Sequence, residues 1–343
     1  MRIVVTGGLG FIGSPVTTTL RDGGHEIVVL DAARSTGLAN TTGGITVVRG
    51  DIRDLDRVRG CLEGADAVVH LAAKVGLGVG ISDIDDYVAV NDLGTAVVLR
   101  AAADAGVRRL VLASSMVVYG EGAYDCPRHG RVRPAPRREE DLRSGRFEPS
   151  CPSCGTELLP GLVAEDDALD PRNVYAATKL HGEHLSASWA RESGGRAVAL
   201  RFHNVYGPGL PVATPYAGVA ALFRTELLAH RAPKVFEDGG QRRDFVAVSD
   251  VARAVATAVE RLPVADGGFR AYNVGSGRVC TVGEVATLLA RATGGPEPEV
   301  TGAFRLGDVR HVTASSARAS AELGWSARIR LEDGLTDLAA EAA

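Results

Sequence analysis

A glycine-rich turn near the N-terminus constrains the fold of this chain more than any other feature. Residues 6–13 read TGGLGFIG, follow an apolar run and open a helix-like stretch, with glycines at positions 7, 10 and 13. Gly7 permits a tight turn, Gly10 lets backbone amides approach a pyrophosphate, and Gly13 lets the helix pack closely against the strand. Strand, turn and helix in this order predict a dinucleotide-binding unit that begins a parallel sheet.

Short apolar runs alternate with helix-like stretches over roughly the first 205 residues. The runs are rich in Val, Ile and Leu, which is typical of strands buried on both faces of a parallel sheet, and they lie at residues 3–6, 27–30, 47–48, 67–71, 110–113 and 197–201. A chain of 343 residues also exceeds the usual size of a single core. We therefore expect an α/β fold, with a Rossmann-type doubly wound parallel sheet over residues 1–205 and a smaller C-terminal α/β substrate lobe. That lobe would span mainly residues 206–343, with some segments returning to the first core.

Residues 124–160 break this alternation and show no periodic apolar face. Cys126 and His129, like Cys151 and Cys154, are separated by two residues, and the two pairs are 21 residues apart. This spacing predicts a zinc-ribbon-like insertion, in which three thiolates and one imidazole close a tetrahedral structural zinc site. The metal would then fold a segment too short to form its own core. A metal-free loop with incidental thiols remains the alternative.

Charge and hydropathy narrow the classes of partner. The formal net charge is −4, and the arginine-rich stretch at residues 128–146 also contains three acidic residues. Nucleic acid is therefore not an expected partner. No apolar run approaches the roughly 18 residues that span a bilayer, and the chain enters a strand pattern without the apolar core of a signal peptide. We expect a cytoplasmic protein with no membrane partner.

Acidic and basic residues follow the predicted strands where a dinucleotide would bind. Asp31 lies 18 residues after Gly13, close to the spacing at which a carboxylate binds the adenosine ribose, and it would repel a 2′-phosphate. NAD is therefore expected rather than NADP. Residues 50–54 and 70–74 also close strands, so Asp51 is a candidate to face adenine. For Asp51 and His70, helix capping or turn chemistry remains the alternative.

Tyr175 and Lys179 are four residues apart, which places a phenol and an ammonium on one helical face. A tyrosine titrates near pH ~10, so it becomes a useful base at neutral pH only when nearby positive charge favours the phenolate. Ser114 and Ser115 follow a predicted strand and offer a hydroxyl partner. A surface Tyr–Lys pair is the alternative, and the glycine-rich turn upstream argues against it.

Together these motifs resemble those of the extended short-chain dehydrogenase/reductases, the family of NAD-dependent nucleotide-sugar epimerases and dehydratases. The resemblance covers nearly the whole chain. It implies that Tyr175 is the base, that Lys179 binds the nicotinamide ribose and lowers the tyrosine pKa, and that Ser115 is the hydroxyl partner. Similar enzymes are homodimers, which implies a homodimer through helices near residues 91–103 and 175–189.

The same resemblance implies a site for tightly bound NAD and a site for a nucleotide-diphosphate sugar. The implied cofactor residues are Gly7, Gly10, Phe11, Ile12, Gly13, Asp31, Asp51, Ile52, Leu71, Ala72, Ala73, Lys74, Asn91, Ser114, Tyr175, Lys179 and His203. The implied substrate residues are Lys74, Ser115, Met116, Tyr175, Asn204, Arg243, Arg305 and Asp308. Arginines are suitable counter-charges for a diphosphate, although solvated surface arginines remain the alternative. Within the family, the insertion resembles that of dTDP-L-rhamnose 4-epimerase-like members, and the substrate residues resemble those of UDP-galactose 4-epimerase-like members.

One departure from the family pattern bears on the reaction. The 4,6-dehydratases carry an Asp-Glu pair directly after the catalytic hydroxyl, and the decarboxylases carry a glutamate there, whereas this chain has Met116 and Val117. Eliminating water needs that additional acid and base, but 4-epimerisation through a transient 4-keto intermediate does not. We therefore expect an NAD-dependent 4-epimerase acting on a TDP- or UDP-hexose. The alternatives are a 4-ketoreductase or dehydrogenase with net NAD(H) turnover, and a non-catalytic NAD-sensing binding protein.

Overall fold

A parallel sheet of seven strands forms the centre of the computed structural model, which describes residues 1–33, 43–76, 81–211 and 218–341. The strands are β1 (Arg2–Thr6), β2 (Glu26–Asp31), β3 (Ile45–Arg49), β4 (Ala67–His70), β5 (Arg109–Ser115), β9 (Arg196–Phe202) and β13 (Phe269–Val274). Their order is β13-β9-β5-β4-β1-β2-β3, and every neighbouring pair is parallel. The predicted α/β fold is thus confirmed. From β1 the strand order proceeds to one side through β2 and β3, and then continues on the other side of β1 with β4. This switch in strand order creates a crevice at the carboxyl ends of β1 and β4.

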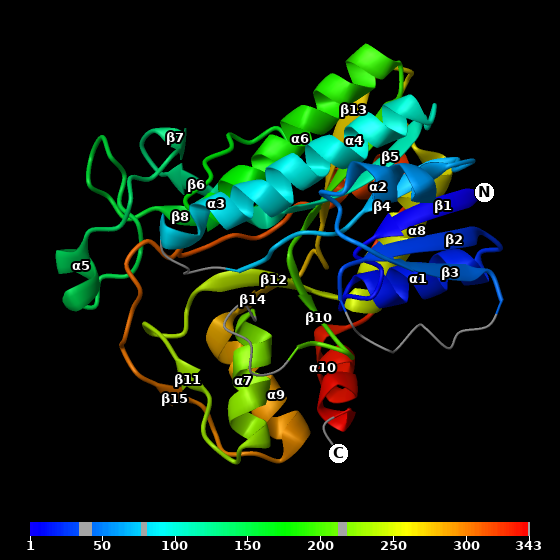
Figure 1. Ribbon diagram of the computed structural model, residues 1–343. Helices are drawn as coiled ribbons and strands as arrows, with labels where there is room; N and C mark the ends of the chain where they lie inside the picture. Colours follow the sequence, from blue (N-terminus) through cyan, green and yellow to red (C-terminus); the bar gives the residue numbers. More distant parts are fainter. Residues whose placement is uncertain (34–42, 77–80, 212–217, 342–343) are drawn as a thin grey trace.

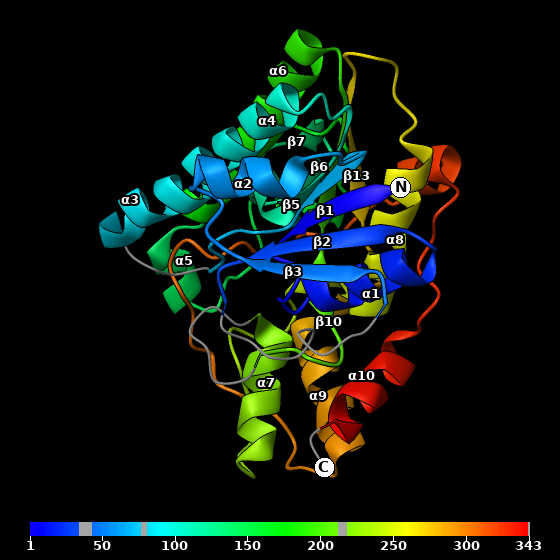
Figure 2. The ribbon, with the colours of Figure 1, turned by 45° about the vertical axis from the view of Figure 1, so that its right-hand side comes forward.

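Helices cover both faces of this sheet (Figures 1 and 2). On one face lie α1 (Gly13–Asp22) and α8 (Val248–Arg261), whose apolar side chains share a core with Ile3 and Val5 of β1. On the other face lie α2 (Leu55–Leu62), α4 (Gly94–Asp104) and α6 (Val174–Ser193), which pack with Val4. Successive residues of a strand point to opposite faces, so an unbroken apolar run supplies both cores.

Short helical segments connect several of the main elements. The helix α3 (Ile84–Tyr87) follows a 3-10 turn (Ile81–Asp83) and leads through a π-helical stretch (Val88–Leu93) into α4. A further 3-10 turn (Met116–Tyr119) follows β5, and a π-helical turn (Ala319–Leu323) lies near the C-terminus. Within the described part of the chain, no helix is both long and apolar enough to cross a bilayer.

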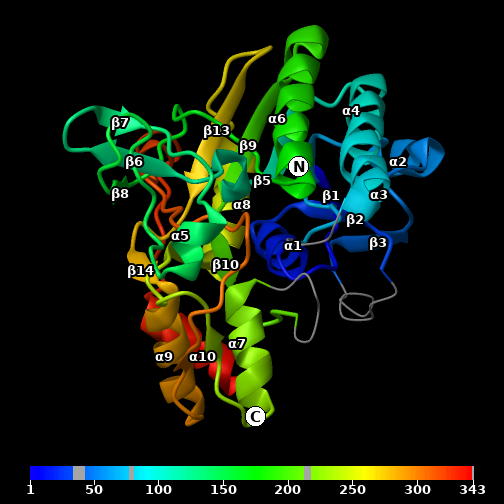
Figure 3. The ribbon, with the colours of Figure 1, turned by 90° about the vertical axis from the view of Figure 1, so that its left-hand side faces the viewer.

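A second lobe lies below the sheet (Figure 3). Its strands are β10 (Asn204–Tyr206), β12 (Arg242–Ala247) and β14 (Val279–Thr281), which form one sheet, and β11 (Lys234–Val235) and β15 (Glu299–Val300), which form another. Its helices α7 (Val219–Leu228), α9 (Val282–Thr293) and α10 (Leu331–Ala340) share a separate core. Beyond residue 205, α8 and β13 belong to the main sheet and its cover. The division of the chain at residue 205 stays a prediction.

The segment at residues 124–160 forms a small unit beside the sheet, at the left of Figure 1. Strands β6 (Ala123–Cys126), β7 (Gly130–Val132) and β8 (Leu159–Gly161) make an antiparallel sheet in the order β7-β6-β8, and α5 (Glu139–Arg143) lies between β7 and β8 in the sequence. Its buried core contains only four residues, namely Tyr124, Cys126, Cys151 and Leu158. Two of the four are cysteines, so apolar packing contributes little to its stability.

The glycine turn tests how tightly β1 and α1 pack. A Cβ atom at Gly13 would lie 2.0 Å from the Gly7 carbonyl oxygen, so we expect Gly13→Ala to lower the free energy of unfolding. Forcing a methyl group into a packed site costs about 1–3 kcal/mol. The matched control is Gly60→Ala, on the exposed face of α2 with nothing within 4 Å of its Cβ, which should be neutral or stabilising. Urea denaturation measures both, and equal midpoints for the two variants would contradict the packing argument.

Candidate active site

The backbone of the glycine turn lies in close contact with the backbone of the loop after β4. Gly7 has a φ of +72°, and a Cβ there would lie 2.7 Å from the Ala72 backbone nitrogen. By contrast, a Cβ at Gly10 would meet only the Gly7 carbonyl oxygen, at 3.4 Å. The Gly10 position therefore leaves space for a ligand next to the N-terminus of α1, as a pyrophosphate requires. Phe11 packs against the core of the second lobe, and Ile12 against the core beneath α1.

Asp31 lies at the end of β2 and contacts the glycine turn directly. Its carboxylate accepts hydrogen bonds from the Leu9 amide at 2.9 Å and the Ala33 amide at 2.8 Å. Asp51, in contrast, is paired with the Arg53 side chain through both carboxylate oxygens, and this hydrogen bonding holds the pKa of Asp51 below its usual value. Ile52 is buried beneath it. Asp31 fits the predicted ribose position, whereas the charge of Asp51 already has a partner.

His70 has a structural environment. Its Nδ1 lies 2.6 Å from the Thr6 hydroxyl and its Nε2 lies 3.0 Å from the Thr95 hydroxyl, so it joins β4 to β1 and α4. Complete burial lowers the pKa of His70 to about 3. The ring is therefore neutral at physiological pH, and this favours the alternative in which His70 stabilises the strand ends.

Tyr175 and Lys179 lie at the start of α6, which begins where the Asn173 side chain accepts a hydrogen bond from the Ala176 amide. The Lys179 Nζ donates to the Ala113 carbonyl oxygen at 2.9 Å and lies 5.8 Å from the centre of the Tyr175 ring. Ser115, at the end of β5, is hydrogen-bonded to the Tyr175 phenol. The three residues predicted to be catalytic therefore meet at the carboxyl end of the sheet.

Burial shifts both titrating groups of this cluster toward their neutral forms. It lowers the pKa of Lys179 to about 8 and raises the pKa of the Tyr175 phenol above its ordinary value. The hydrogen bond from Ser115 acts in the opposite direction on Tyr175, and the neighbouring Tyr87 adds to the increase. An additional positive charge bound near the phenol would lower its pKa, which is the condition under which tyrosine acts as a base.

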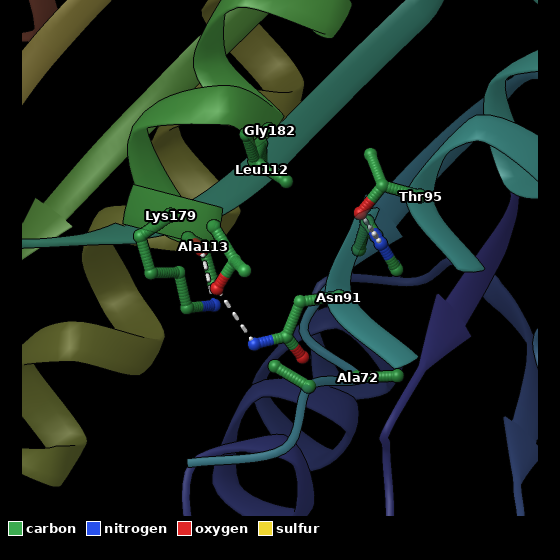
Figure 4. Close-up of a pocket in the computed structure, with 10 residues that line it drawn as sticks. Ala72, Asn91, Thr95, Leu112, Ala113, Lys179 and Gly182 are labelled. Atoms are coloured by element: carbon green, nitrogen blue, oxygen red, sulfur yellow. Dashed lines mark hydrogen bonds between the residues drawn. The ribbon is translucent and has the colours of Figure 1, made fainter. Parts of the chain in front are cut away.

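Asn91 connects the loop after β4 to α6. Its amide nitrogen donates to the Lys74 carbonyl and to the Thr178 hydroxyl, each at 3.0 Å, and its amide oxygen accepts from the Lys74 backbone at 2.7 Å. Figure 4 shows Ala72, Asn91 and Lys179 around one small cavity, which Leu112 and Gly182 also line. Leu71 and Ala73 flank Ala72 in the same loop, so this predicted segment lies beside the Tyr–Lys cluster.

Two predicted ligand residues already have partners in the protein. The Lys74 ammonium forms ion pairs with Asp83, just before α3, and with Asp86, within α3. The Ser114 hydroxyl donates to the buried Glu183 carboxylate at 2.5 Å. Their assignment to NAD or substrate stays a prediction, and each would have to exchange or extend these contacts to bind a ligand.

Three segments of the second lobe and its border supply four of the predicted substrate residues, namely Asn204, Arg243, Arg305 and Asp308. The Asn204 amide donates to the Asp244 carbonyl at 3.1 Å and contacts the Met116 sulfur at 3.5 Å. Beside it, His203 is buried, which lowers its pKa to about 3. Met116 and Asn204 thus border the Ser115 side of the cluster.

Arg243 and the two charged residues near position 305 lie together. The Arg243 guanidinium donates to the carbonyls of Arg242, Val309 and Arg310, at 2.8 Å each. The Asp308 carboxylate interacts electrostatically with Arg305 and Arg243. Arg305 is exposed and stacks over the Phe236 ring at 5.2 Å. Two guanidinium groups and one carboxylate therefore lie together where a diphosphate was predicted to bind.

Sequence reasoning missed two charged residues of the insertion, Arg137 and Glu148, which reach the same region. The Arg137 side chain also interacts with the Asp308 carboxylate, and Glu148 pairs with the buried Arg310. The arginine-rich stretch at residues 128–146 indicated that charged contacts could form there, but only the fold shows that Arg137 is the buried arginine that makes them.

The four predicted metal ligands form one cluster. The ligand atoms of Cys126, His129, Cys151 and Cys154 all lie within 4.8 Å of one another. The His129 Nδ1 is 3.5 Å from the sulfur atoms of both Cys126 and Cys151, and the sulfur atoms of Cys126 and Cys154 are 3.7 Å apart. Thiolates bound tetrahedrally to zinc at about 2.3 Å lie about 3.8 Å apart, so the donor set and its spacing fit the ion.

Comparison with known proteins identifies the family. The model of the NAD dependent epimerase/dehydratase family matches residues 3–152 and 154–275, and the chain belongs to this family. It is 33% identical to the dTDP-L-rhamnose 4-epimerase of Burkholderia thailandensis, over 98% of this chain and 93% of that protein. It is 32% identical to the UDP-glucose 4-epimerase of Mycolicibacterium smegmatis, over 98% and 96% of the two chains. The structure of MoeE5 in complex with UDP-glucose and NAD superimposes with a TM-score of 0.79 at 33% identity, over 99% of this chain and 98% of MoeE5. The predicted family is confirmed.

The buried neutral His70 makes stability depend on pH. Its folded-state pKa of about 3 lies below the ordinary value of 6.5, so the unfolded chain takes up a proton as the pH falls below 6.5 and the folded chain does not. This contribution to stability is complete above pH 6.5 and is lost progressively toward pH 3. We expect His70→Gln, which still bonds to both threonines, to reduce the loss of unfolding free energy between about pH 7 and about pH 5 by about 2 kcal/mol.

Chemical denaturation at each pH measures this loss. The matched control is His184→Gln, because His184 is exposed on α6. Equal pH dependence in wild type and His70→Gln would show that His70 is not the titrating group.

Proposed function

We propose that this protein is an NAD-dependent nucleotide-sugar 4-epimerase that acts on a TDP- or UDP-hexose through a transient 4-keto intermediate. The observation that carries the proposal is the meeting of Ser115, Tyr175 and Lys179 beside the loop that the glycine turn contacts. The named relatives support it, since two of them are 4-epimerases and the structural neighbour binds UDP-glucose and NAD.

The residues at the carboxyl edge fit NAD. Gly7 and Gly13 leave no room for a side chain, while Gly10 leaves open space at the N-terminus of α1. Asp31 would accept hydrogen bonds from the ribose hydroxyls and exclude a 2′-phosphate, and the loop 71–74 and Asn91 would border the nicotinamide half. When bound, NAD supplies a reversible hydride acceptor and a positive charge.

The chain's own residues would move the proton. Tyr175 would take the proton of the C4 hydroxyl and later return it, while Ser115 holds the phenol and the sugar oxygen in line. Lys179, four residues on, has its Nζ 5.8 Å from the centre of the Tyr175 ring and would stabilise the phenolate by its charge. Met116 stands where a dehydratase carries a carboxylate, and it faces Asn204 rather than an acid or base. The sugar therefore meets one proton-transfer group, which is sufficient for epimerisation.

Arg243, Arg305 and Asp308 would hold the nucleotide diphosphate. The two guanidinium groups neutralise phosphate charge, and the carboxylate accepts from a ribose hydroxyl. A net ketoreductase on the same substrates is the second candidate function, favoured by the same Tyr–Lys pair. An NAD-sensing module without catalysis would leave that pair without a role.

Removal of the Tyr175 hydroxyl tests the catalytic proposal. We expect purified wild-type protein to interconvert a pair of C4 epimers in a panel of dTDP-, UDP- and GDP-sugars, followed by NMR, without accumulating reduced cofactor. Tyr175→Phe should lower kcat by about 10³-fold, the usual contribution of a general base, while NAD stays bound.

The outcomes separate the candidates. Stoichiometric formation of reduced cofactor would identify the net oxidoreductase. Tyr175→Phe with unchanged turnover would exclude Tyr175 as the base. The Thr18→Val variant serves as a control for an unrelated hydroxyl deletion, since Thr18 lies on α1, away from the cluster.

We also propose that the insertion holds a structural zinc ion, that the protein is a homodimer and that it works in the cytoplasm. Four protein ligands leave no coordination position for water, so the metal would stabilise a fold rather than react. Reduced thiolates as ligands are typical of a reducing compartment. The homodimer is supported by exposed apolar residues along the segment from α3 to α4, namely Ile81, Ile84, Val88 and Leu93.

Metal analysis tests the zinc proposal. We expect about one zinc ion per chain, and Cys151→Ser should lose it and make residues 124–160 sensitive to proteolysis. Cys61→Ala should keep its zinc, because Cys61 is buried between α2 and the sheet. Wild-type protein with far less than one metal per chain would leave the metal-free loop as the correct interpretation.

A further inference from the structure

The segment 305–312 carries two of the predicted substrate residues and crosses from the second lobe toward the main sheet. Arg305 and Asp308 lie at its start, and Val312 at its end pairs with β12, where the Val312 amide donates to the Arg242 carbonyl at 3.1 Å. Arg310 and His311 within it are almost completely buried. Anything that fixes these two residues therefore fixes the position of Arg305 and Asp308.

Glu148 of the insertion binds both of these buried residues. One carboxylate oxygen accepts from the Arg310 Nε at 2.9 Å and Nη2 at 2.7 Å, and the other lies 2.7 Å from the His311 Nε2. Burial raises the pKa of Glu148, but His311 and Arg310 outweigh this effect and hold it below its ordinary value. Glu148 is therefore ionised, and both of its oxygens are used as acceptors.

The protonation of His311 extends this contact to Arg243. The His311 Nδ1 accepts from the Arg242 amide at 2.9 Å, so the ring proton of the neutral histidine is on Nε2 and is donated to Glu148. Arg242 is the first residue of β12 and Arg243 the second. Glu148 thus orients the histidine that holds the start of this strand.

Arg137 makes a second connection from the insertion. Its side chain is 5% exposed, and its Nη2 lies 2.9 Å from a Glu237 carboxylate oxygen and donates to the Asp308 carbonyl at 2.7 Å. Its Nη1 donates to the Phe147 carbonyl, next to Glu148. Figures 1 and 3 show α5, which follows Arg137 in the sequence, near the orange segment of the chain.

Buried charges of this kind are stable only when every member has a partner. Arg310 is shared by Glu148, Glu237 and Asp238, so the insertion supplies one of its three carboxylates. The insertion itself has a core of four residues, which includes two of the proposed zinc ligands. The position of Glu148 therefore depends on the folding of the Cys/His cluster.

We propose that the Cys/His insertion sets the affinity for the nucleotide diphosphate, with Glu148 as the positioning residue that holds the segment 305–312 and Arg243 in place. The proposal rests on the function assigned above to Arg243, Arg305 and Asp308. The hydrogen bonds of Glu148 go to Arg310 and His311 and not to Arg243, Arg305 or Asp308, so its effect appears in nucleotide binding and not in the proton transfer.

The test is the isosteric variant Glu148→Gln. An amide has one oxygen and one NH2 group, so a donor must face either Arg310 or His311. We expect about tenfold weaker binding of dTDP or UDP by calorimetry, with unchanged NAD binding, unchanged zinc content and a raised KM at nearly unchanged kcat. Glu157→Gln is the matched control, because Glu157 is exposed on the same insertion and its contact there is a backbone bridge.

A second measurement on unmodified protein covers the case in which Glu148→Gln fails to fold. Removal of zinc by a chelator should weaken dTDP or UDP binding at least as much and leave NAD binding intact, and added zinc should restore it. Wild-type nucleotide affinity in folded Glu148→Gln, or in metal-free protein, would overturn this inference alone. Wild-type protein that binds neither nucleotide would overturn the proposed function as well.

Discussion

The close contact between the glycine turn and the loop after β4 is the constraint on which the rest of the site depends. A Cβ atom at Gly7 would lie only 2.7 Å from the Ala72 nitrogen, so the two backbones lie too close together for any side chain at this position. This contact places the N-terminus of α1 beside the loop that Asn91 joins to α6. Lys179 therefore lies beside the same loop that the glycine turn contacts.

The same packing controls the chemistry through burial. His70, His203 and Lys179 all have lowered pKa values because they lie beneath the strand ends, and the pKa of Tyr175 is raised for the same reason. A site built this way favours neutral groups until a charged ligand enters. The reactive form of the phenol then depends on the ligand, which restricts proton transfer to the occupied site.

The sequence predicted those parts of the site that are formed by residues close together in the chain. Each of these patterns, namely the apolar runs, the glycine spacing and the Tyr175–Lys179 spacing, involves residues only a few positions apart. The two cysteine pairs likewise predicted a cluster, and the fold brings their ligand atoms together. Partners remote in sequence were not predictable. The pairing of Ser114 with Glu183 spans 69 residues, and that of Glu148 with Arg310 spans 162. Such contacts follow from the arrangement of whole lobes, which the spacing of apolar residues along the sequence does not reveal.

The two halves of the site consequently rest on different forces. The dinucleotide half is held by close-packed backbone and apolar side chains, which tolerate little variation in shape. The proposed substrate half is held by a network of buried arginines and their carboxylate partners, to which the insertion contributes Arg137 and Glu148. Removing one partner of a buried ion pair leaves an uncompensated charge, so each of these contacts depends on its partner. On our proposal, the close-packed backbone then holds the cofactor, while the segment that would contact the nucleotide is positioned by a separate unit built around its own Cys/His cluster.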